Sequence, residues 1–114
     1  MSKPDKTYQP IQAVTVKAAE DLPAFRFVSH LGSVCAENQK ALGVSDVNWL
    51  KDEFSSVITL GTIAIETTTT INIGSAVSTS TDGKAKPATG GTEINGRALD
   101  SCNGAGFIKI SIVP

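Results

Sequence analysis

Short apolar runs alternate with turn residues along most of the chain, and each run is too short for a typical helix. Apolar and polar residues alternate over residues 13–17, which predicts a half-buried strand. Residues 25–28 predict a second short strand with Phe25 and Phe27 on one face, and residues 33–36 a third. Pro23 separates the first two because it fixes its own backbone and restricts the residue before it.

The longest apolar run covers residues 57–66 and has a glycine in its middle. Ile58 and Leu60 share one face of the predicted strand, whereas Ile63 and Ile65 share the other, with Gly61 between them. A glycine at such a switch is typical of a bulge or bend where a sheet curls or changes its pairing partner. We therefore expect this strand to turn a corner of a barrel or sandwich.

The second half of the chain continues the same pattern of short strands and turns. Asp82-Gly83 separates two strand-like runs and supplies the residues that a tight type I′ hairpin turn requires. Asn95-Gly96 predicts a further turn. The last predicted strand, residues 107–113, places Ile108, Ile110 and Ile112 on one face.

One segment, residues 46–54, has a helical spacing of apolar residues. Ser45 or Asp46 can cap a helix there, and Val47, Leu50 and Phe54 then fall on one side. The alternative is a long loop with Trp49 exposed, and the sequence does not decide between the two.

The first twelve residues contain two prolines and few apolar side chains, and we interpret residues 1–12 as an extended arm. Its sizeable apolar residues are Tyr8 and Ile11. The arm is either a frayed terminus or a segment that becomes ordered on a partner. Residues 13–114 then form one domain. The predicted fold is all-β: a small, mainly antiparallel β-barrel or sandwich with this arm and at most one short helix.

Composition narrows the functional classes. The chain has 114 residues, with ten basic and eleven acidic side chains and a net charge of −1. A nucleic-acid-binding protein usually carries a basic patch, whereas Lys84 and Lys86 beside a turn are typical of solvated surface. Residues 1–10 are polar, and no run is long enough to span a bilayer. We expect no nucleic-acid partner, no membrane partner and synthesis in a cytoplasm.

The sequence offers little for catalysis or metal binding. Its single histidine, His30, has no identifiable nucleophile or orienting partner. Gly104 and Gly106 precede a strand rather than a helix, so they do not form a phosphate loop. Cys35 and Cys102 match no zinc spacing, and whether they pair in a disulfide is left open. We expect no enzyme activity, no cofactor and no metal.

The order of motifs in residues 41–114 resembles a family of small tailed-bacteriophage proteins encoded beside the major capsid protein, the capsid decoration or cement proteins. The shared pattern is a Leu-Gly-Val turn, a strand ending in glycine, an Ile-x-x-Gly-x-x-Val step, an Asp-Gly-Lys-Ala hairpin, a Gly-x-Ala-Leu strand and a terminal strand after glycines. In this chain these are Leu42-Gly43-Val44, residues 57–61, residues 71–77, Asp82-Gly83-Lys84-Ala85, Gly96-Arg97-Ala98-Leu99 and residues 106–113.

The resemblance implies a structural protein that binds the outer surface of the expanded phage head and stabilises it. It implies the major capsid protein as partner and self-association, with a trimer favoured. Interface residues are then Tyr8 and Ile11 of the arm and Trp49, the sole tryptophan, because aromatic residues are common in binding hot spots. For Trp49 the alternative is a residue that caps the core under a loop.

Three other functions remain as alternatives. The first is another structural role on a phage, such as a head or tail adaptor. The second is a small module that binds ligands or glycans, although such modules usually expose several aromatic side chains. The third is an enzyme, which requires a site built from His30, Cys35 or Cys102.

Overall fold

The computed structural model describes residues 7–113, and this part of the chain is built from eight β-strands and one short 3-10 turn. The strands are β1 (Pro10–Lys17), β2 (Arg26–Val28), β3 (Gly43–Ser45), β4 (Phe54–Thr67), β5 (Ala76–Thr79), β6 (Ala85–Pro87), β7 (Gly96–Ala98) and β8 (Gly106–Ile112). The 3-10 turn, η1, spans Thr81–Gly83. The all-β prediction is confirmed. No helix in residues 7–113 has the length and hydropathy that crossing a membrane requires.

Five of the strands form a closed barrel. The pairing runs from β4 to β6, β5, β7 and β8, and β8 pairs again with β4. The contact between β4 and β6 is parallel, and the other pairs in the ring are antiparallel. Closure leaves the ring without a free edge, which is a stable arrangement for a small sheet.

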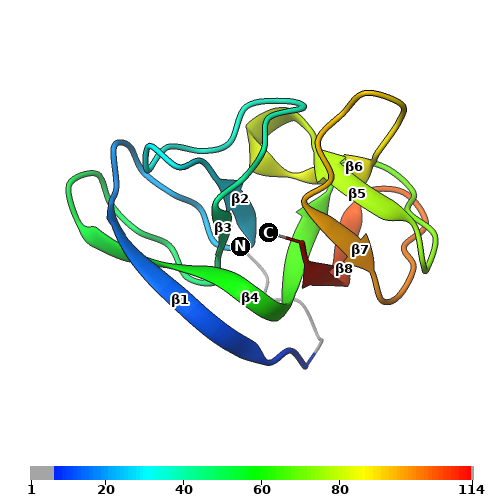
Figure 1. Ribbon diagram of the computed structural model, residues 1–114, viewed down its shortest axis with the longest axis horizontal. Helices are drawn as coiled ribbons and strands as arrows, with labels where there is room; N and C mark the ends of the chain where they lie inside the picture. The colour runs from blue at the N-terminus through cyan, green and yellow to red at the C-terminus, as the bar shows by residue number, and fades with distance from the viewer. Residues whose placement is uncertain (1–6, 114) are drawn as a thin grey trace.

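The remaining three strands extend the first half of β4 into a side sheet. β3 pairs with one edge of β4 and β2 pairs with β3, while β1 pairs antiparallel with the other edge of β4. Figure 1 shows β1 as the long outer strand of this side sheet, away from the barrel strands β5–β8. β4 is therefore common to both sheets.

Gly61 is the point at which β4 passes from one sheet to the other. Its partner is Pro10 of β1, whereas the next residue, Thr62, already pairs with Ser111 of β8. Gly61 has φ +108°, which is a conformation that side chains disfavour. The predicted change of pairing partner at Gly61 is confirmed.

The bend at Gly61 also changes which residues of β4 face inward. Ile58 lies before the bend, Ile63 and Ile65 lie after it, and all three belong to the same core cluster. Strict alternation would put even and odd positions on opposite faces. This bend shifts the alternation by one residue, so that even-numbered Ile58 before it and odd-numbered Ile63 and Ile65 after it face the same core. One strand therefore supplies both sheets with core residues.

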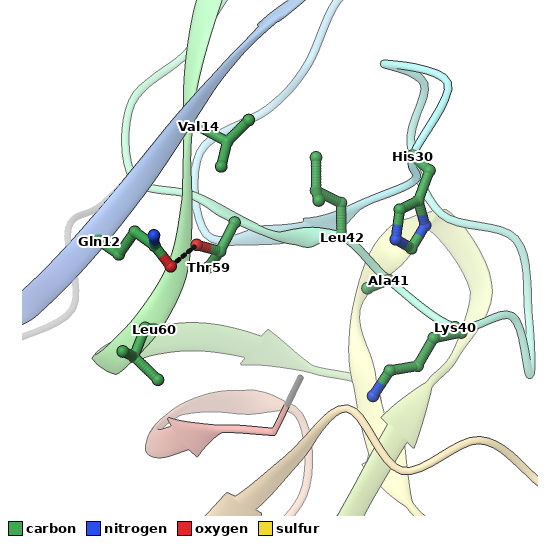
Figure 2. Close-up of a pocket in the computed structure, with 8 residues that line it drawn as sticks. All are labelled: Gln12, Val14, His30, Lys40, Ala41, Leu42, Thr59 and Leu60. Atoms are coloured by element: carbon green, nitrogen blue, oxygen red, sulfur yellow. Dashed lines mark hydrogen bonds between the residues drawn. The ribbon is translucent and has the colours of Figure 1, made fainter.

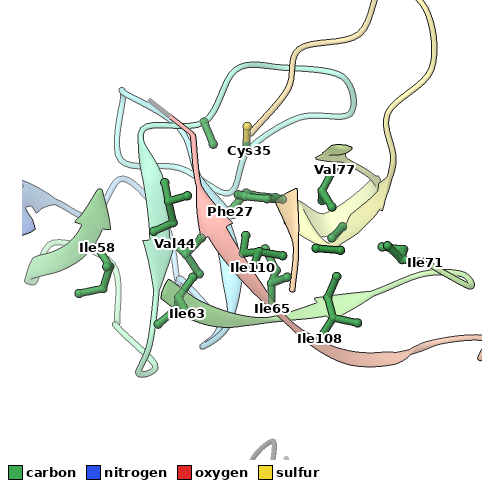
Figure 3. Close-up of a cluster of buried hydrophobic side chains, with 14 residues drawn as sticks. Phe27, Cys35, Val44, Ile58, Ile63, Ile65, Ile71, Val77, Ile108 and Ile110 are labelled. Carbon is green, nitrogen blue, oxygen red and sulfur yellow. The ribbon is translucent and has the colours of Figure 1, made fainter. Parts of the chain in front are cut away.

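The main core fills the barrel and is aliphatic apart from Phe27 and Cys35 (Figure 3). β8 contributes Ile108, Ile110 and Ile112 from one face, as predicted, each 6% exposed or less. Two smaller clusters pack outside the barrel. One surrounds Leu22 and Val57, and the other surrounds Phe25 and Ala64.

The Asp82-Gly83 hairpin is confirmed. β5 and β6 are antiparallel, and both Asp82 (φ +58°) and Gly83 (φ +72°) adopt the positive φ of a type I′ turn. The N–H of Lys84 donates to the carbonyl of Thr81 at 3.2 Å and closes the turn.

The guanidinium group of Arg26 fixes this hairpin to the side sheet. Arg26 lies in β2, and it donates to the Glu66 carboxylate of β4 at 3.0 Å and to the carbonyl of Asp82 at 3.1 Å. The ammonium nitrogen of Lys84 lies 3.4 Å from an oxygen of the same carboxylate.

Two expectations for the first half of the chain are wrong. Phe25 and Phe27 do not share a face, because Phe25 has φ +61° just before β2 and packs in a different cluster from Phe27. A strand does not form over residues 33–36, where a single bridge joins Val34 to Val28.

Residues 46–54 form a loop, not a helix, up to the start of β4 at Phe54. Trp49 and Leu22 exchange backbone hydrogen bonds of 2.8 and 2.9 Å, so the donors and acceptors that a helix would use are engaged elsewhere. Asp52 has φ +73°, which also interrupts a helix. The loop alternative is the correct one, although Trp49 is partly buried rather than exposed.

The predicted arm is only partly described, since residues 1–6 lie outside the described residues. From Pro10 onward the chain already belongs to β1, three residues before the expected start of the strand. Because β1 is nearly all exposed, the expected half-buried pattern of residues 13–17 is absent from the single chain.

Candidate interaction surface

β1 is exposed along almost its whole length. Seven of its eight residues are exposed, and Val16 is half-buried. Ile11 is 72% exposed and Val14 is 40% exposed. Among the described strands β1 pairs only with β4, so its outer edge has no strand partner in residues 7–113.

A groove of about 390 Å³ lies beside β1. Figure 2 shows its two walls, with the side chains of β1 and β4 on one side and those of residues 30 and 40–42 on the other. Most of its exposed lining is apolar, although four of its eight residues are polar; these eight residues are Gln12, Val14, His30, Lys40, Ala41, Leu42, Thr59 and Leu60. The Thr59 hydroxyl donates to the side-chain oxygen of Gln12 at 3.2 Å across the two strands.

Lys40 holds one end of this groove. Its ammonium group donates to the carbonyl of Ile94 at 2.6 Å and to that of Val113 at 2.9 Å. Burial lowers the pKa of Lys40, and the nearby Glu93 carboxylate acts in the opposite direction. The residue therefore fixes the groove wall to the end of β8.

More exposed apolar side chains lie at the other end of β1. Phe54, 71% exposed, pairs with Lys17 at the end of the strand. Leu31, 81% exposed, precedes Gly32, whose carbonyl accepts a hydrogen bond from Ala19. Exposed apolar groups thus occur from one end of β1 to the other, a property typical of interaction surfaces.

Tyr8, predicted as an interface residue, packs on the body of the protein. Its ring makes an edge-to-face contact with Phe25 at 6.1 Å between centroids, and Phe25 makes a similar contact with Phe107. Burial raises the pKa of Tyr8, and the negative charge of Asp46 raises it further. An interface role for this residue stays a prediction.

Trp49 packs against the cluster around Leu22 and Val57, so the structure places it as a partly buried cap on that cluster. Its indole N–H is buried without a hydrogen-bond partner among the described residues. Tyr8 and Trp49 therefore lie against different clusters, and only Ile11 of the three predicted interface residues is on the exposed strand. An interface role for Trp49 and Ile11 also stays a prediction.

The groups considered for catalysis lie in separate surroundings. His30 is exposed at the groove, whereas Cys35 is buried and Cys102 is partly buried. Burial raises the pKa of Cys35, and a hydrogen bond from Thr79 partly opposes this. Both cysteines are free thiols in the structure. Within residues 7–113 no three His, Cys, Asp or Glu side chains gather in a metal-binding arrangement.

Comparison with known proteins gives a likeness in fold. No family model and no curated protein matches the chain. The crystal structure of the head fiber gp8.5 N base of bacteriophage phi29 matches with a TM-score of 0.73, over 90% of this chain and 93% of that chain, at 20% sequence identity. The two proteins share a fold.

The likeness covers nine-tenths of this chain and a similar share of the matched one. At this sequence identity the comparison establishes the architecture, and no residue of this chain can be assigned a role from the matched protein. The candidate surface therefore depends on the residues of this chain alone.

No motif in the sequence marks the groove residues. Val14 belongs to β1, Leu42 lies just before β3, and Lys40 lies in a loop. A signal is nevertheless present in β1 itself. Ile11 falls outside the alternation that Val14 and Val16 follow, and an additional apolar residue of this kind is unusual for a strand with one face in water.

Proposed function

We propose that this protein is a structural component of a tailed-phage head that binds the outer surface of the expanded capsid and stabilises it. Its partner in this role is the major capsid protein, and it acts as an oligomer, with a trimer favoured. The observation that carries the proposal is the shared fold with a phage head fiber base over 90% of the chain.

A second line of support is independent of that match. The order of motifs in residues 41–114 resembles capsid decoration proteins, and it includes the Asp82-Gly83 hairpin and the apolar run up to Gly61. These motifs form a type I′ turn and a bend in β4, respectively. Sequence pattern and three-dimensional fold therefore point separately to proteins of phage heads.

The physical basis of the proposed role is multivalent binding. An oligomer that touches several capsid subunits gains affinity without any single strong contact, because each later contact is made at high effective concentration. If the capsid site forms only when expansion brings subunits into register, binding stabilises the expanded state by its differential affinity.

The decisive experiment is cosedimentation of the purified protein with undecorated capsids of its own phage, in expanded and unexpanded forms. We expect saturable binding to expanded capsids only, together with a higher temperature of capsid disruption after binding. An unrelated protein of similar mass without affinity for capsids serves as the control. Absence of binding to both capsid forms would contradict the proposal.

A second candidate is an adaptor or fibre attachment base on the head. It is favoured by the nature of the matched structure, which is the base of a head fiber. The number of copies on each particle separates the two candidates. Occupancy over the whole lattice supports decoration, whereas a single ring of copies supports an adaptor.

A further inference from the structure

We propose that β1 and the groove beside it are covered by a second copy of this chain, so that they form the contact through which the protein self-associates. This inference rests on the proposed function, which includes an oligomer, and assigns that oligomer a surface. We call this surface the β1 ribbon, and it consists of β1 (Pro10–Lys17) together with residues 54–61 of β4.

β1 is exposed on both of its faces, although a two-stranded ribbon is marginally stable in water unless one face is packed. Residues 54–61 are packed on the body of the protein through Val57 and Ile58. β1 contributes no buried residue to the core clusters, and its Val16 packs only at the edge of one. Ile11 and Val14 are left in water, although covering them would be favourable.

The ribbon is almost uncharged, because Lys17 is the only charged residue in its sixteen positions. Natural proteins usually protect a free strand edge with charges, a bulge or proline. Pro10 and a register shift between Pro10 and Ala13 protect one end of β1, but residues 13–16 are regular and uncharged.

The neutrality of the ribbon bears on the nature of its partner. Two copies of one chain present identical charges, so a charged surface would repel itself, whereas a neutral one does not. A strongly charged partner would instead be matched by opposite charges on the ribbon, and these are missing from its sixteen positions. A second copy is the partner that fits this surface.

The area of the ribbon determines how much of it a neighbour must cover. β1 is about 27 Å long and a strand is about 5 Å wide, so each of its faces offers about 130 Å². The β4 half of the ribbon adds little, because Ser55, Val57 and Ile58 are buried against the body of the protein. Both faces and the free edge of β1 together offer about 400 Å², whereas each partner in a stable interface contributes about 800 Å². A stable contact therefore needs a neighbour that covers β1 and also the groove and the exposed side chains beside it, such as Leu31 and Phe54.

The groove supplies the recess that such a neighbour would fill. Val14 and Leu60 of the ribbon form one apolar wall, and Leu42 lies opposite (Figure 2). The same surface thus combines protruding apolar side chains, such as Ile11, with an unfilled apolar recess. Both are requirements for a surface that packs against a copy of itself.

The test compares the wild type with the double variant Ile11→Lys, Val14→Lys by sedimentation velocity over a range of concentrations. The matched control is Ile73→Lys, since Ile73 is 66% exposed and lies outside the ribbon. We expect an oligomer for the wild type and the control. In the double variant we expect the dissociation constant to rise about a hundredfold or more, because burial of two such side chains is lost.

A measurement on the wild type keeps the test decisive if the double variant does not fold. Amide hydrogen exchange over residues 10–17 should be slow at high concentration and become fast on dilution below the dissociation constant. A wild type that is monomeric at all concentrations would overturn the inference. An oligomer in which exchange over residues 10–17 is independent of concentration would also overturn it.

Failure of this inference is distinguishable from failure of the proposed function. A monomer that still binds expanded capsids overturns the inference alone. An oligomer held through β1 that binds no capsid overturns the proposed function alone. Protection of β1 that appears only on capsids makes the capsid the partner of the ribbon, and it also overturns the inference.

Discussion

Tyr8 is the only tyrosine of the chain and reports directly on how its N-terminal end is packed. Burial beside Phe25 and the charge of Asp46 both disfavour the phenolate, so we expect a native pKa above the ordinary value of 10.0. The absorbance of tyrosinate during an alkaline titration measures it. Asp46→Asn should bring the midpoint part of the way back, and denaturant should bring it the whole way.

The sign of the accompanying stability change follows from the direction of the pKa shift. Because the folded pKa is raised, the unfolded chain loses the Tyr8 proton first as pH rises. The contribution of this group to stability is fully present below pH 10.0 and is lost as pH passes through the folded pKa. A native midpoint at or below the denatured one would contradict this description of Tyr8.

Asn95 is a second residue whose surroundings determine a measurable effect. It is 2% exposed, and its amide group donates to the carbonyl of Gln39 and the hydroxyl of Thr79 and accepts from the N–H of Ala41. Asn95→Ala leaves the buried N–H of Ala41 without its acceptor and removes one donor each from Gln39 and Thr79, which still bond to each other, so we expect a loss of about 2 kcal/mol in the free energy of unfolding. Chemical denaturation measures it.

The control for this prediction is Asn72→Ala, since Asn72 is exposed. An exposed substitution of this kind should change the free energy of unfolding by less than about 0.5 kcal/mol. Equal effects of the two substitutions would show that the buried amide group contributes little.

At the scale of elements, the bend in β4 depends on Gly61. A Cβ at this position would lie 2.5 Å from the carbonyl oxygen of Gln9 and 2.7 Å from the nitrogen of Ile11, both backbone atoms. We therefore expect Gly61→Ala to destabilise the protein by about 3 kcal/mol or more, as strain at φ and a backbone clash add together. Thermal and chemical denaturation test this.

Gly74 provides the matched control, because it has φ +86° but no atom of the described residues within 4 Å of the position that a Cβ would occupy. Gly74→Ala should cost about 1 kcal/mol from the backbone conformation alone. The difference between the two variants measures the close approach of β1 to β4. Equal losses would mean that the approach of the two strands does not constrain Gly61.

How far the sequence predicts these elements depends on whether their signal is local. The Asp82-Gly83 turn and the exchange of partners at Gly61 are set by backbone preferences of the residues themselves, and both are confirmed. The loop around Trp49 is instead held by backbone hydrogen bonds to Leu22, which lies far earlier in the sequence. Helical spacing alone is no guide to such a long-range pairing.

The candidate surface is still less accessible to sequence reasoning. Ile11 can be singled out from the sequence because it is a large apolar residue in a polar segment, and it is exposed in the structure. The groove, however, exists only because Val14 and Leu42 come together from segments that are far apart in sequence. Its residues become visible as a set only after the strands are paired.

At the scale of the whole molecule, the proposed role draws on two separate observations, the shared fold and the candidate surface. The match to a head fiber base concerns the framework, which this chain reproduces over 90% of its length. The nearly uncharged β1 ribbon is the surface through which copies of the chain are proposed to associate. In the proposed role, self-association multiplies weak contacts with the capsid, which is the origin of high avidity.

The sharing of β4 between the two sheets has a mechanical consequence. A pull on the outer strand passes through its hydrogen bonds into the first half of β4, and then along covalent backbone into the closed barrel. The path along β4 contains no flexible linker between the two sheets. A displacement imposed on β1 is therefore transmitted through β4 to the closed barrel, so that the side sheet and the barrel move together.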